Sequence, residues 1–465
     1  MMNKEILRMR IRHIGKLGMI AALSASPASA QVLFAQDTLQ NDDGAQVTAP
    51  AISEAPVSDR PVFESQEVVQ EDPRDPVIQG WSAAKAMELV SLIENIGTEG
   101  LDPADYRPEL LMEEIERGES AALDRLASTT FTWLVEDLRD GRTPMESRRQ
   151  WFVVDPDADL IPTSDLMTQA LASGDLASIT RTLAPAHEDY ATLREALAET
   201  PEANAGKRRM IRANMDRWRW LPRDLGGQYL LTNVPEYQLR LTVNGKIIRT
   251  YRTIVGAPGR TATPQLAETV EGVVFNPTWT VPQSIVVGEG LGNRVLNNPS
   301  WARANGYRAT RGANGYISVV QQPGGGNSLG QMKLDMPNPH AIFLHDTPAR
   351  NLFDSDNRAR SHGCIRVERA LELAMTVAIL GGGASRDEAV AVSQSGDYTR
   401  VPVERTIPVY ITYFTYGVDV DGNLREFEDL YSRDAPVLAA LDAPRVGNRA
   451  TLSAEEVVPI EAPGA

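Results

Sequence analysis

The chain has 465 residues, which is enough for two or three domains rather than one compact domain. Its 42% hydrophobic and 23% charged residues are ordinary for a soluble globular protein and exclude a membrane bundle. The formal net charge of −16 disfavours nucleic acid and anionic lipid as partners.

The N-terminus reads as a secretory signal peptide over residues 1–30. Basic residues from Lys4 to Lys16 precede a short apolar run, and Ala28-Ser29-Ala30 supplies a small-residue cleavage site. No later segment approaches about twenty uninterrupted apolar residues, so we expect no transmembrane segment in the mature protein. Residues 31–76 are rich in Ala, Pro, Asp, Glu and Gln and predict a flexible acidic linker.

A helical domain is predicted over residues 77–200. Apolar periodicity places helices at 83–93, 108–118, 122–139 and 190–199, with turn residues between them. A connecting segment, 201–225, holds one more helix at 207–221, where Ile211, Met215 and Trp218 share one face. We interpret that face as a packing surface.

After Gly226 the pattern changes to short strands, at 228–233, 237–243, 246–255, 269–275 and 316–320. Asn244-Gly245 is typical of a type I′ hairpin turn, and the whole pattern indicates an antiparallel sandwich or barrel. The regularity lapses over 276–315, which we interpret as a capping insertion carrying Trp279, Trp301 and Tyr307. The main domain is expected to span 226–385, followed by an α/β C-terminal extension at 386–442 and a disordered tail at 443–465.

Cys364 is the only cysteine, although cysteines of exported proteins usually come in pairs. Three of the five histidines lie at 340, 345 and 362, near it in the chain. A cysteine nucleophile needs a base, and His345, at the end of a strand predicted over 341–344, is the candidate. The backbone N–H groups of Gly363 and Cys364 are candidates for an oxyanion hole.

Other interpretations of these residues remain open. Cys364 is alternatively a buried core residue. A zinc site of His345, His362 and Cys364 is disfavoured, because neither paired cysteines nor HExxH occurs, so we expect no metal and no cofactor. His362 either supports catalysis or orients the loop, and Arg366 either anchors the loop or pairs with a substrate carboxylate or the thiolate.

His345, fifteen intervening residues and then Ser361-His362-Gly363-Cys364 resemble the signature of the YkuD-type L,D-transpeptidases. Further blocks are similar to the YcbB-like branch of that family, including its scaffold domain. They lie at 100–106, 137–142, 218–222, 276–282, 323–330, 345–348 and 413–415. The chain departs from the branch in two ways. It leaves no room for a peptidoglycan-binding module between 199 and 206, and it has Phe343 where many relatives have Tyr.

The resemblance implies an α+β protein, with a helical scaffold domain before a mainly β catalytic domain that carries the capping insertion. Cys364 would form a thioester with a stem tetrapeptide, releasing D-Ala, and His345 would move the protons. The main-chain carbonyl of Asp346 would orient His345. Roles in binding substrate are expected for a wider set: Arg366, Ser361, Trp279, Asn327 and Phe343.

The same resemblance implies a periplasmic protein that acts on peptidoglycan stem peptides and is acylated by carbapenems. Three acceptors for the acyl group remain open: the diaminopimelate amine of another stem, an amine of an outer-membrane protein, and water, which would make the protein an L,D-carboxypeptidase. A rival of a different class is a non-catalytic wall-binding scaffold, in which Cys364 has no chemical role.

Overall fold

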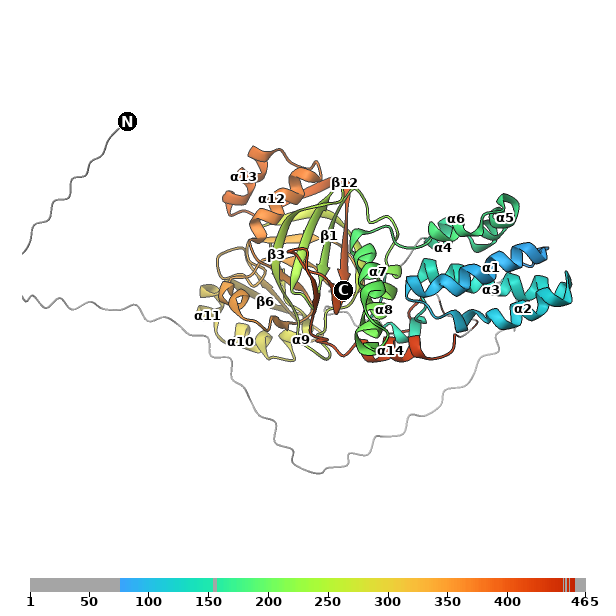
Figure 1. Cartoon of the computed structure of the whole chain (residues 1–465). Coiled ribbons are helices and arrows are strands. Elements are labelled where there is room, and N and C mark those ends of the chain that lie inside the picture. The colour runs from blue at the N-terminus through green and yellow to red at the C-terminus, as the bar shows by residue number, and fades with distance from the viewer. Residues whose placement is uncertain (1–75, 154–156, 446, 448–449, 451, 456–465) are drawn as a thin grey trace, which may run out of the picture. The chain divides into compact units, whose positions relative to one another are not determined.

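The structure, a computed structural model, describes residues 76–153, 157–445, 447, 450 and 452–455 (Figure 1). The predicted signal peptide and nearly all of the predicted acidic linker lie outside the described residues. All the described residues belong to one compact unit. In the part of the chain that is described, no helix is long and apolar enough to cross a membrane.

The first region is helical. Its helices are α1 (Ala83–Asn95), α2 (Pro108–Arg117), α3 (Ala121–Asp140), α4 (Asp157–Leu160), α5 (Thr163–Ser173), α6 (Leu176–Arg181) and α7 (Glu188–Glu199), with 3₁₀ turns at Ile96–Glu99, Pro103–Tyr106 and Met145–Ser147. The hydroxyls of Ser82 and Ser120 cap α1 and α3 by accepting a backbone N–H of the first turn. The four helices predicted in this region are confirmed, whereas α4 to α6 were not predicted.

Helix α8 (Ala205–Arg219) packs against α7, α14 and β13, and its apolar face is buried as predicted. It also buries charge. The Asp216 carboxylate accepts the backbone N–H groups of Arg142 (2.6 Å) and Thr143 (3.0 Å) and the indole N–H of Trp220 (3.0 Å). Arg217 forms an ion pair with Asp434 at 2.7 Å. Buried polar groups need such partners, and these partners join α8 to the ends of α3 and α14.

The β region is a nine-stranded mixed sheet in the order β10-β3-β11-β9-β8-β4-β12-β1-β2. Since β2 also pairs with β3, the sheet closes into a barrel, one of the two architectures expected. The prediction that the strands are antiparallel is wrong for three pairs, β1–β12, β10–β3 and β9–β11, which are parallel because other segments of the chain connect their strands. Its strands are β1 (Gln228–Asn233), β2 (Gln238–Val243), β3 (Lys246–Gly256), β4 (Leu266–Phe275), β8 (Met332–Asp335), β9 (Leu344–His345), β10 (Ala359–Ser361), β11 (Ile365–Val367) and β12 (Thr399–Thr412). Helix α12 (Ala370–Leu380) buries its apolar side in the same core. Asn244 and Gly245 both have positive φ, as the predicted hairpin turn requires.

We predicted that residues 386–442 extend the catalytic region from outside. Instead, part of this segment belongs to the barrel itself. Strand β12 lies between β4 and β1 and therefore completes the barrel (Figure 1). Pro402 and Pro408 interrupt its strand pattern, and the pairing with β4 shifts register between Pro402 and Ile407. The segment also contains α13 (Arg386–Ser395), β13 (Tyr416–Val418), β14 (Leu424–Glu426) and α14 (Asp434–Asp442).

The prediction of a disordered tail from residue 443 is wrong at its start. The Arg445 side chain is buried and ion-paired with Glu136 (2.6 Å) and Asp137 (2.9 Å) of α3. Its backbone N–H donates to Asp105. A buried, paired guanidinium holds this part of the tail against the helical region.

The capping subdomain, residues 276–321, has a three-stranded sheet and a core of its own. The sheet has the order β5-β7-β6, and its strands are β5 (Trp279–Thr280), β6 (Tyr307–Arg311) and β7 (Ile317–Gln321). Helices α9 (Gln283–Val286), α10 (Leu291–Asn297) and α11 (Pro299–Ala304) complete it. The strand predicted at 316–320 therefore belongs to this subdomain and not to the barrel, so the insertion extends past Gly315.

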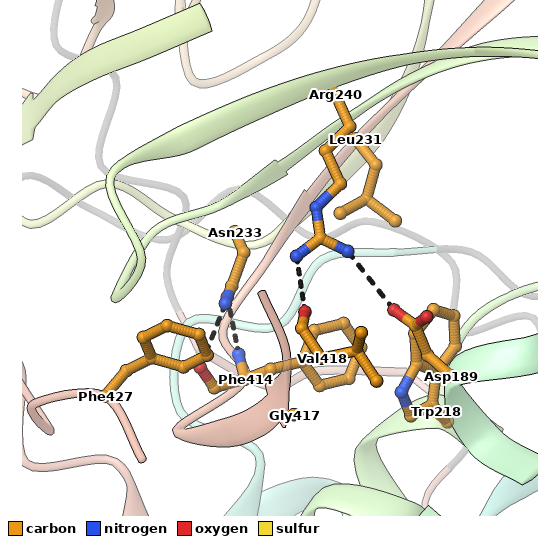
Figure 2. Close-up of a pocket in the computed structure, with 9 residues that line it drawn as sticks. All are labelled: Asp189, Trp218, Leu231, Asn233, Arg240, Phe414, Gly417, Val418 and Phe427. Atoms are coloured by element: carbon orange, nitrogen blue, oxygen red, sulfur yellow. Dashed lines mark hydrogen bonds and ion pairs between the residues drawn. The ribbon is translucent and has the colours of Figure 1, made fainter. Parts of the chain in front are cut away.

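A small pocket marks where the barrel meets α7 and α8 (Figure 2). Arg240 of β2 fills much of it, donating to Asp189 (3.2 Å) and to the carbonyl of Val418 (2.6 Å). The remaining volume is about 10 Å³, which suits a single water molecule. This pocket is a structural junction and is too small for a peptide.

Candidate active site

His345 ends β9, and Cys364 directly precedes β11, which is the parallel neighbour of β9. Arg366 lies opposite His345, and Ile365 opposite Leu344. Ile365 is fully buried while Cys364 and Arg366 on either side of it are only partly buried. Because successive side chains of a strand point to opposite faces, Cys364, Arg366 and His345 share one face of the barrel wall.

The imidazole of His345 is held in one tautomer. Its Nδ1 lies 2.5 Å from the backbone carbonyl of Asp346, and since a carbonyl only accepts, Nδ1 carries the proton. Burial, followed by the positive charge of Arg366, lowers the pKa of His345 to about 3. His345 is therefore neutral at neutral pH, with Nε2 available as a proton acceptor.

The Asp346 carboxylate fixes the backbone that orients His345. It accepts the N–H of Gln331 (2.9 Å) and a hydrogen bond from Arg350 (3.0 Å), and burial raises its pKa. Gly330 packs directly on it: a Cβ at that position would lie 2.3 Å from the Asp346 carboxylate. The carbonyl of Asp346 thus orients the imidazole of His345, and the side chain of Asp346 holds the backbone that carries this carbonyl.

The loop before the cysteine is shaped by Ser361. Its hydroxyl donates to the carbonyl of Cys364 (2.6 Å) and accepts the N–H of Gly363 (3.1 Å). Gly363 has φ +122°, where a side chain is strained, and its carbonyl accepts from the Thr263 hydroxyl at 2.8 Å. The Gly363 N–H is therefore occupied within the loop, which contradicts its predicted place in an oxyanion hole. Ser361 thus shapes the loop, and its predicted contact with substrate stays a prediction.

The Cys364 thiol lies against the segment that leads into β9. Its sulfur donates to the carbonyl of Ala341 at 3.6 Å. Ala341 has φ +53°, and only Leu344 and His345 form β9, so the strand predicted over 341–344 is too long. The reason is Asn338, whose side chain bonds both the N–H (3.1 Å) and the carbonyl (2.7 Å) of Ile342 in place of a strand partner.

His362 points away from this group. It is exposed, and its Nε2 lies 3.1 Å from a carboxylate oxygen of Glu289 in the capping subdomain. The structure thus brings His362 to the capping subdomain and not to the imidazole of His345.

Three other predicted substrate ligands have packing partners. Asn327 is buried, and its amide donates to the carbonyls of Pro277 (3.0 Å) and Gln322 (2.9 Å) and accepts from the N–H of Leu329 (2.8 Å). Those contacts hold the loop, and the predicted role of Asn327 in binding substrate stays a prediction. Trp279 packs between the barrel core and the core of the capping subdomain, and Phe343 is part of the barrel core.

Lys333 is a site residue that the sequence did not reveal. It lies opposite His345 in the β8–β9 pair, its ammonium is 3.9 Å from the centre of the Phe343 ring, and its charge helps to lower the pKa of His345. Strand β8 was not predicted, and no motif surrounds Lys333. With Arg366 it makes this wall of the barrel cationic, which suits a substrate that carries carboxylates.

The aromatic residues proposed for the cap pack within it. Trp301 stacks on Tyr307 with 5.6 Å between ring centroids, and Arg294 lies 4.0 Å from the centre of the Trp301 ring. Among the described residues, no group of three or more His, Cys, Asp or Glu side chains is placed to hold a metal ion.

Comparison with known proteins assigns both regions. Residues 227–411 match the YkuD family, described as the L,D-transpeptidase catalytic domain, and residues 79–197 match the Scaffold domain family. Residues 227–411 therefore form an L,D-transpeptidase catalytic domain of the YkuD family. More specifically, this domain follows a Scaffold domain at 79–197, which is the order of domains that the resemblance to the YcbB-like branch predicts.

One curated relative is a Haemophilus influenzae protein named "Putative L,D-transpeptidase", 30% identical over 239 residues. The match covers 48% of this chain and 48% of that protein, so the chain spans about half the length of this relative. Two solved structures are also similar. An L,D-transpeptidase from Mycobacterium smegmatis has 14% identity and a TM-score of 0.21, covering 40% of this chain and 58% of that chain. L,D-transpeptidase 1 of Mycobacterium tuberculosis has 13% identity and a TM-score of 0.18, covering 40% and 61%. At such TM-scores the likeness carries no argument.

Proposed function

We propose that this protein is a peptidoglycan L,D-transpeptidase that crosslinks two stem peptides through an acyl-enzyme on Cys364. The observation that carries the proposal is the match of residues 227–411 to the L,D-transpeptidase catalytic domain. Within those residues, the lone cysteine directly precedes β11, and β11 pairs with the strand that ends in a neutral histidine whose Nδ1 is already fixed. That arrangement suits a nucleophile and its base.

In the first half-reaction, the Cys364 sulfur attacks the carbonyl between diaminopimelate and the terminal D-Ala of a tetrapeptide. Nε2 of His345 takes the thiol proton as the S–C bond forms, and the imidazolium then protonates the leaving amine as the C–N bond breaks. D-Ala leaves and a thioester remains. The low pKa of His345 makes it a weak base and a strong acid, so it returns the proton readily to the amine.

The positive charges beside the cysteine support the same step. Arg366 and Cys364 interact electrostatically, and a guanidinium near a thiol favours the thiolate. Lys333 and Arg366 are also placed to attract a carboxylate of the diaminopimelate residue at the acylated position. Burial lowers the pKa of Arg366, yet the group stays charged at neutral pH.

In the second half-reaction, the side-chain amine of another diaminopimelate attacks the thioester. His345 removes a proton from that amine and returns one to the sulfur, which leaves as the new amide forms. The product is a diaminopimelate-to-diaminopimelate crosslink. We further propose that the chain acts in the periplasm after export through residues 1–30, because that is where a peptidoglycan acyl acceptor is found.

The test is to incubate the mature protein with diaminopimelate-containing disaccharide tetrapeptides and to identify the products by mass spectrometry. We expect a crosslinked dimer together with free D-Ala, and neither from Cys364→Ala protein. Release of D-Ala without a dimer would establish a carboxypeptidase instead. Dimer formation by Cys364→Ala protein would leave the mechanism without its nucleophile.

A further inference from the structure

A second pocket lies beside α8, on residues that belong neither to the Cys364 loop nor to the barrel. It has a volume of about 310 Å³ and is lined by the loop at 97–103 and by the segment that opens α8. Pockets of roughly 300 Å³ or more are large enough for a small ligand. Exposed residues at its rim, such as Glu202 and Ala205, leave it accessible to solvent.

Two arginines of the pocket are charged groups without a carboxylate partner. Arg208 donates through Nη1 to the carbonyls of Leu197 (2.9 Å) and Thr200 (2.6 Å), and Arg212 donates through Nε to the carbonyl of Gly100 (2.7 Å). Over the described ranges, neither guanidinium forms an ion pair, and no protein acceptor binds the Nη groups of Arg212. These bonds anchor the two side chains and leave donor groups for a ligand.

The same pocket also carries unpaired negative charge. Asp102 and Glu202 line it, and neither forms an ion pair with any residue that the structure describes. Asp102 uses one oxygen to accept the N–H of Ala104 at the start of a 3₁₀ turn, which fixes its side chain. Opposite charges that line one pocket without pairing suit a ligand that bears both charges.

The Gly100-Leu101-Asp102-Pro103 block of the sequence builds this arrangement. Gly100 has φ +74°, and a Cβ there would lie 3.3 Å from Cγ of Arg212. The glycine therefore lets the loop pass close over Arg212 and brings Asp102 to the pocket. The mechanism at Cys364 gives this block no role.

We propose that this pocket binds a zwitterionic amino-acid group, with Arg208 and Arg212 on its carboxylate and Asp102 and Glu202 on its ammonium. The identity of the ligand rests on the proposed function: we assign it as the free amino-acid end of a diaminopimelate residue in peptidoglycan. The pocket is then a second contact with the wall, made by residues outside the catalytic domain.

The first experiment tests the pocket without reference to catalysis. Mature Cys364→Ala protein is titrated calorimetrically with free meso-diaminopimelate, with pimelate, which lacks the amines, and with cadaverine, which lacks the carboxylates. We expect binding of meso-diaminopimelate alone. Arg212→Gln and Asp102→Asn should each weaken it at least tenfold, and the asparagine can still cap the 3₁₀ turn. Arg181→Gln, on an exposed residue of α6, is the control and should leave binding unchanged.

Equal binding of pimelate would mean that the pocket takes any dicarboxylate anion. Equal affinity of the Arg212→Gln protein for meso-diaminopimelate would mean that this pocket is not where the ligand binds. Either result overturns the proposal.

The second experiment compares tetrapeptides that contain diaminopimelate with tetrapeptides that contain lysine, which lacks the second carboxylate. A loss of affinity on Arg212→Gln only for the diaminopimelate peptide supports the wall as the source. If meso-diaminopimelate binds through Arg212 but no crosslinked dimer ever forms, the pocket stands and the proposed function fails.

Discussion

Replacing His345 by Asn should change how the stability of the fold depends on pH. Asn keeps an amide donor for the Asp346 carbonyl but cannot be protonated. In the folded chain the pKa of His345 is lowered to about 3 from 6.5, chiefly by burial. A histidine with a depressed folded pKa contributes stability that is fully present above pH 6.5 and is lost as the pH falls towards 3.

The magnitude follows from that pKa difference. Protonating His345 in the unfolded chain but not in the folded chain costs the native state about 1.4 kcal/mol per pH unit below pH 6.5, and about 5 kcal/mol in all. At pH 4.5 the wild-type protein should therefore have lost about 3 kcal/mol more than the His345→Asn protein, relative to each protein at pH 7. The carboxylates titrate in both proteins and cancel in the comparison.

The assay is urea unfolding followed by circular dichroism at pH 7, 5.5 and 4.5. His362→Asn is the matched control, because that histidine is exposed, and it should parallel the wild-type protein. If the stability of wild-type and His345→Asn proteins falls in parallel with pH, then His345 is not a buried neutral imidazole. The assignment of Nε2 as an unprotonated acceptor at neutral pH would fail with it.

Three further predictions concern the same chain. Carbapenem should add its mass to Cys364, as read by intact-protein and peptide mass spectrometry; an adduct that persists in Cys364→Ala protein would contradict this. Ser361→Ala removes the hydroxyl that bonds the Gly363 N–H and the Cys364 carbonyl, so we expect the free energy of unfolding in urea to fall by about 2 kcal/mol. Carbapenem acylation should also be slower, and an unchanged acylation rate would show that Ser361 does not shape the loop. Arg445→Met leaves Glu136 and Asp137 of α3 without that partner and should destabilise the protein by about 3 kcal/mol, against no change for Arg181→Gln; equal melting temperatures would mean that the tail does not clamp α3.

Much of the fold was predictable where neighbouring residues decide it. Apolar residues recur at helical spacing in α1, α2, α3, α7 and α8. In strands β1 to β4 apolar and polar residues alternate, and turn residues mark the ends of these strands. Strand β12 was missed because its prolines and its register shift hide a pattern that only pairing with β4 and β1 stabilises. The short strands β8 to β11 have too few residues to show a period.

The candidate site was predictable in its location and not in its hydrogen bonds. The spacing of His345 and Cys364 pointed to the segments that form β9 and precede β11. The partner of the Gly363 N–H, the packing of Asn327 and the place of Lys333 each depend on segments distant in the chain or on loop geometry. No sequence pattern specifies those.

The amino-acid sequence by itself determined which reactive groups the protein carries: a lone thiol, a histidine upstream of it in the chain, and the helical and strand segments that hold them. Tertiary structure decided what state those groups are in. His345 is neutral because β8 and β11 bury it beside two cations, and its tautomer is set because the Asp346 side chain holds the carbonyl in place. Burial and charge proximity arise only when strands far apart in the chain pair, and therefore they cannot be read from any one segment.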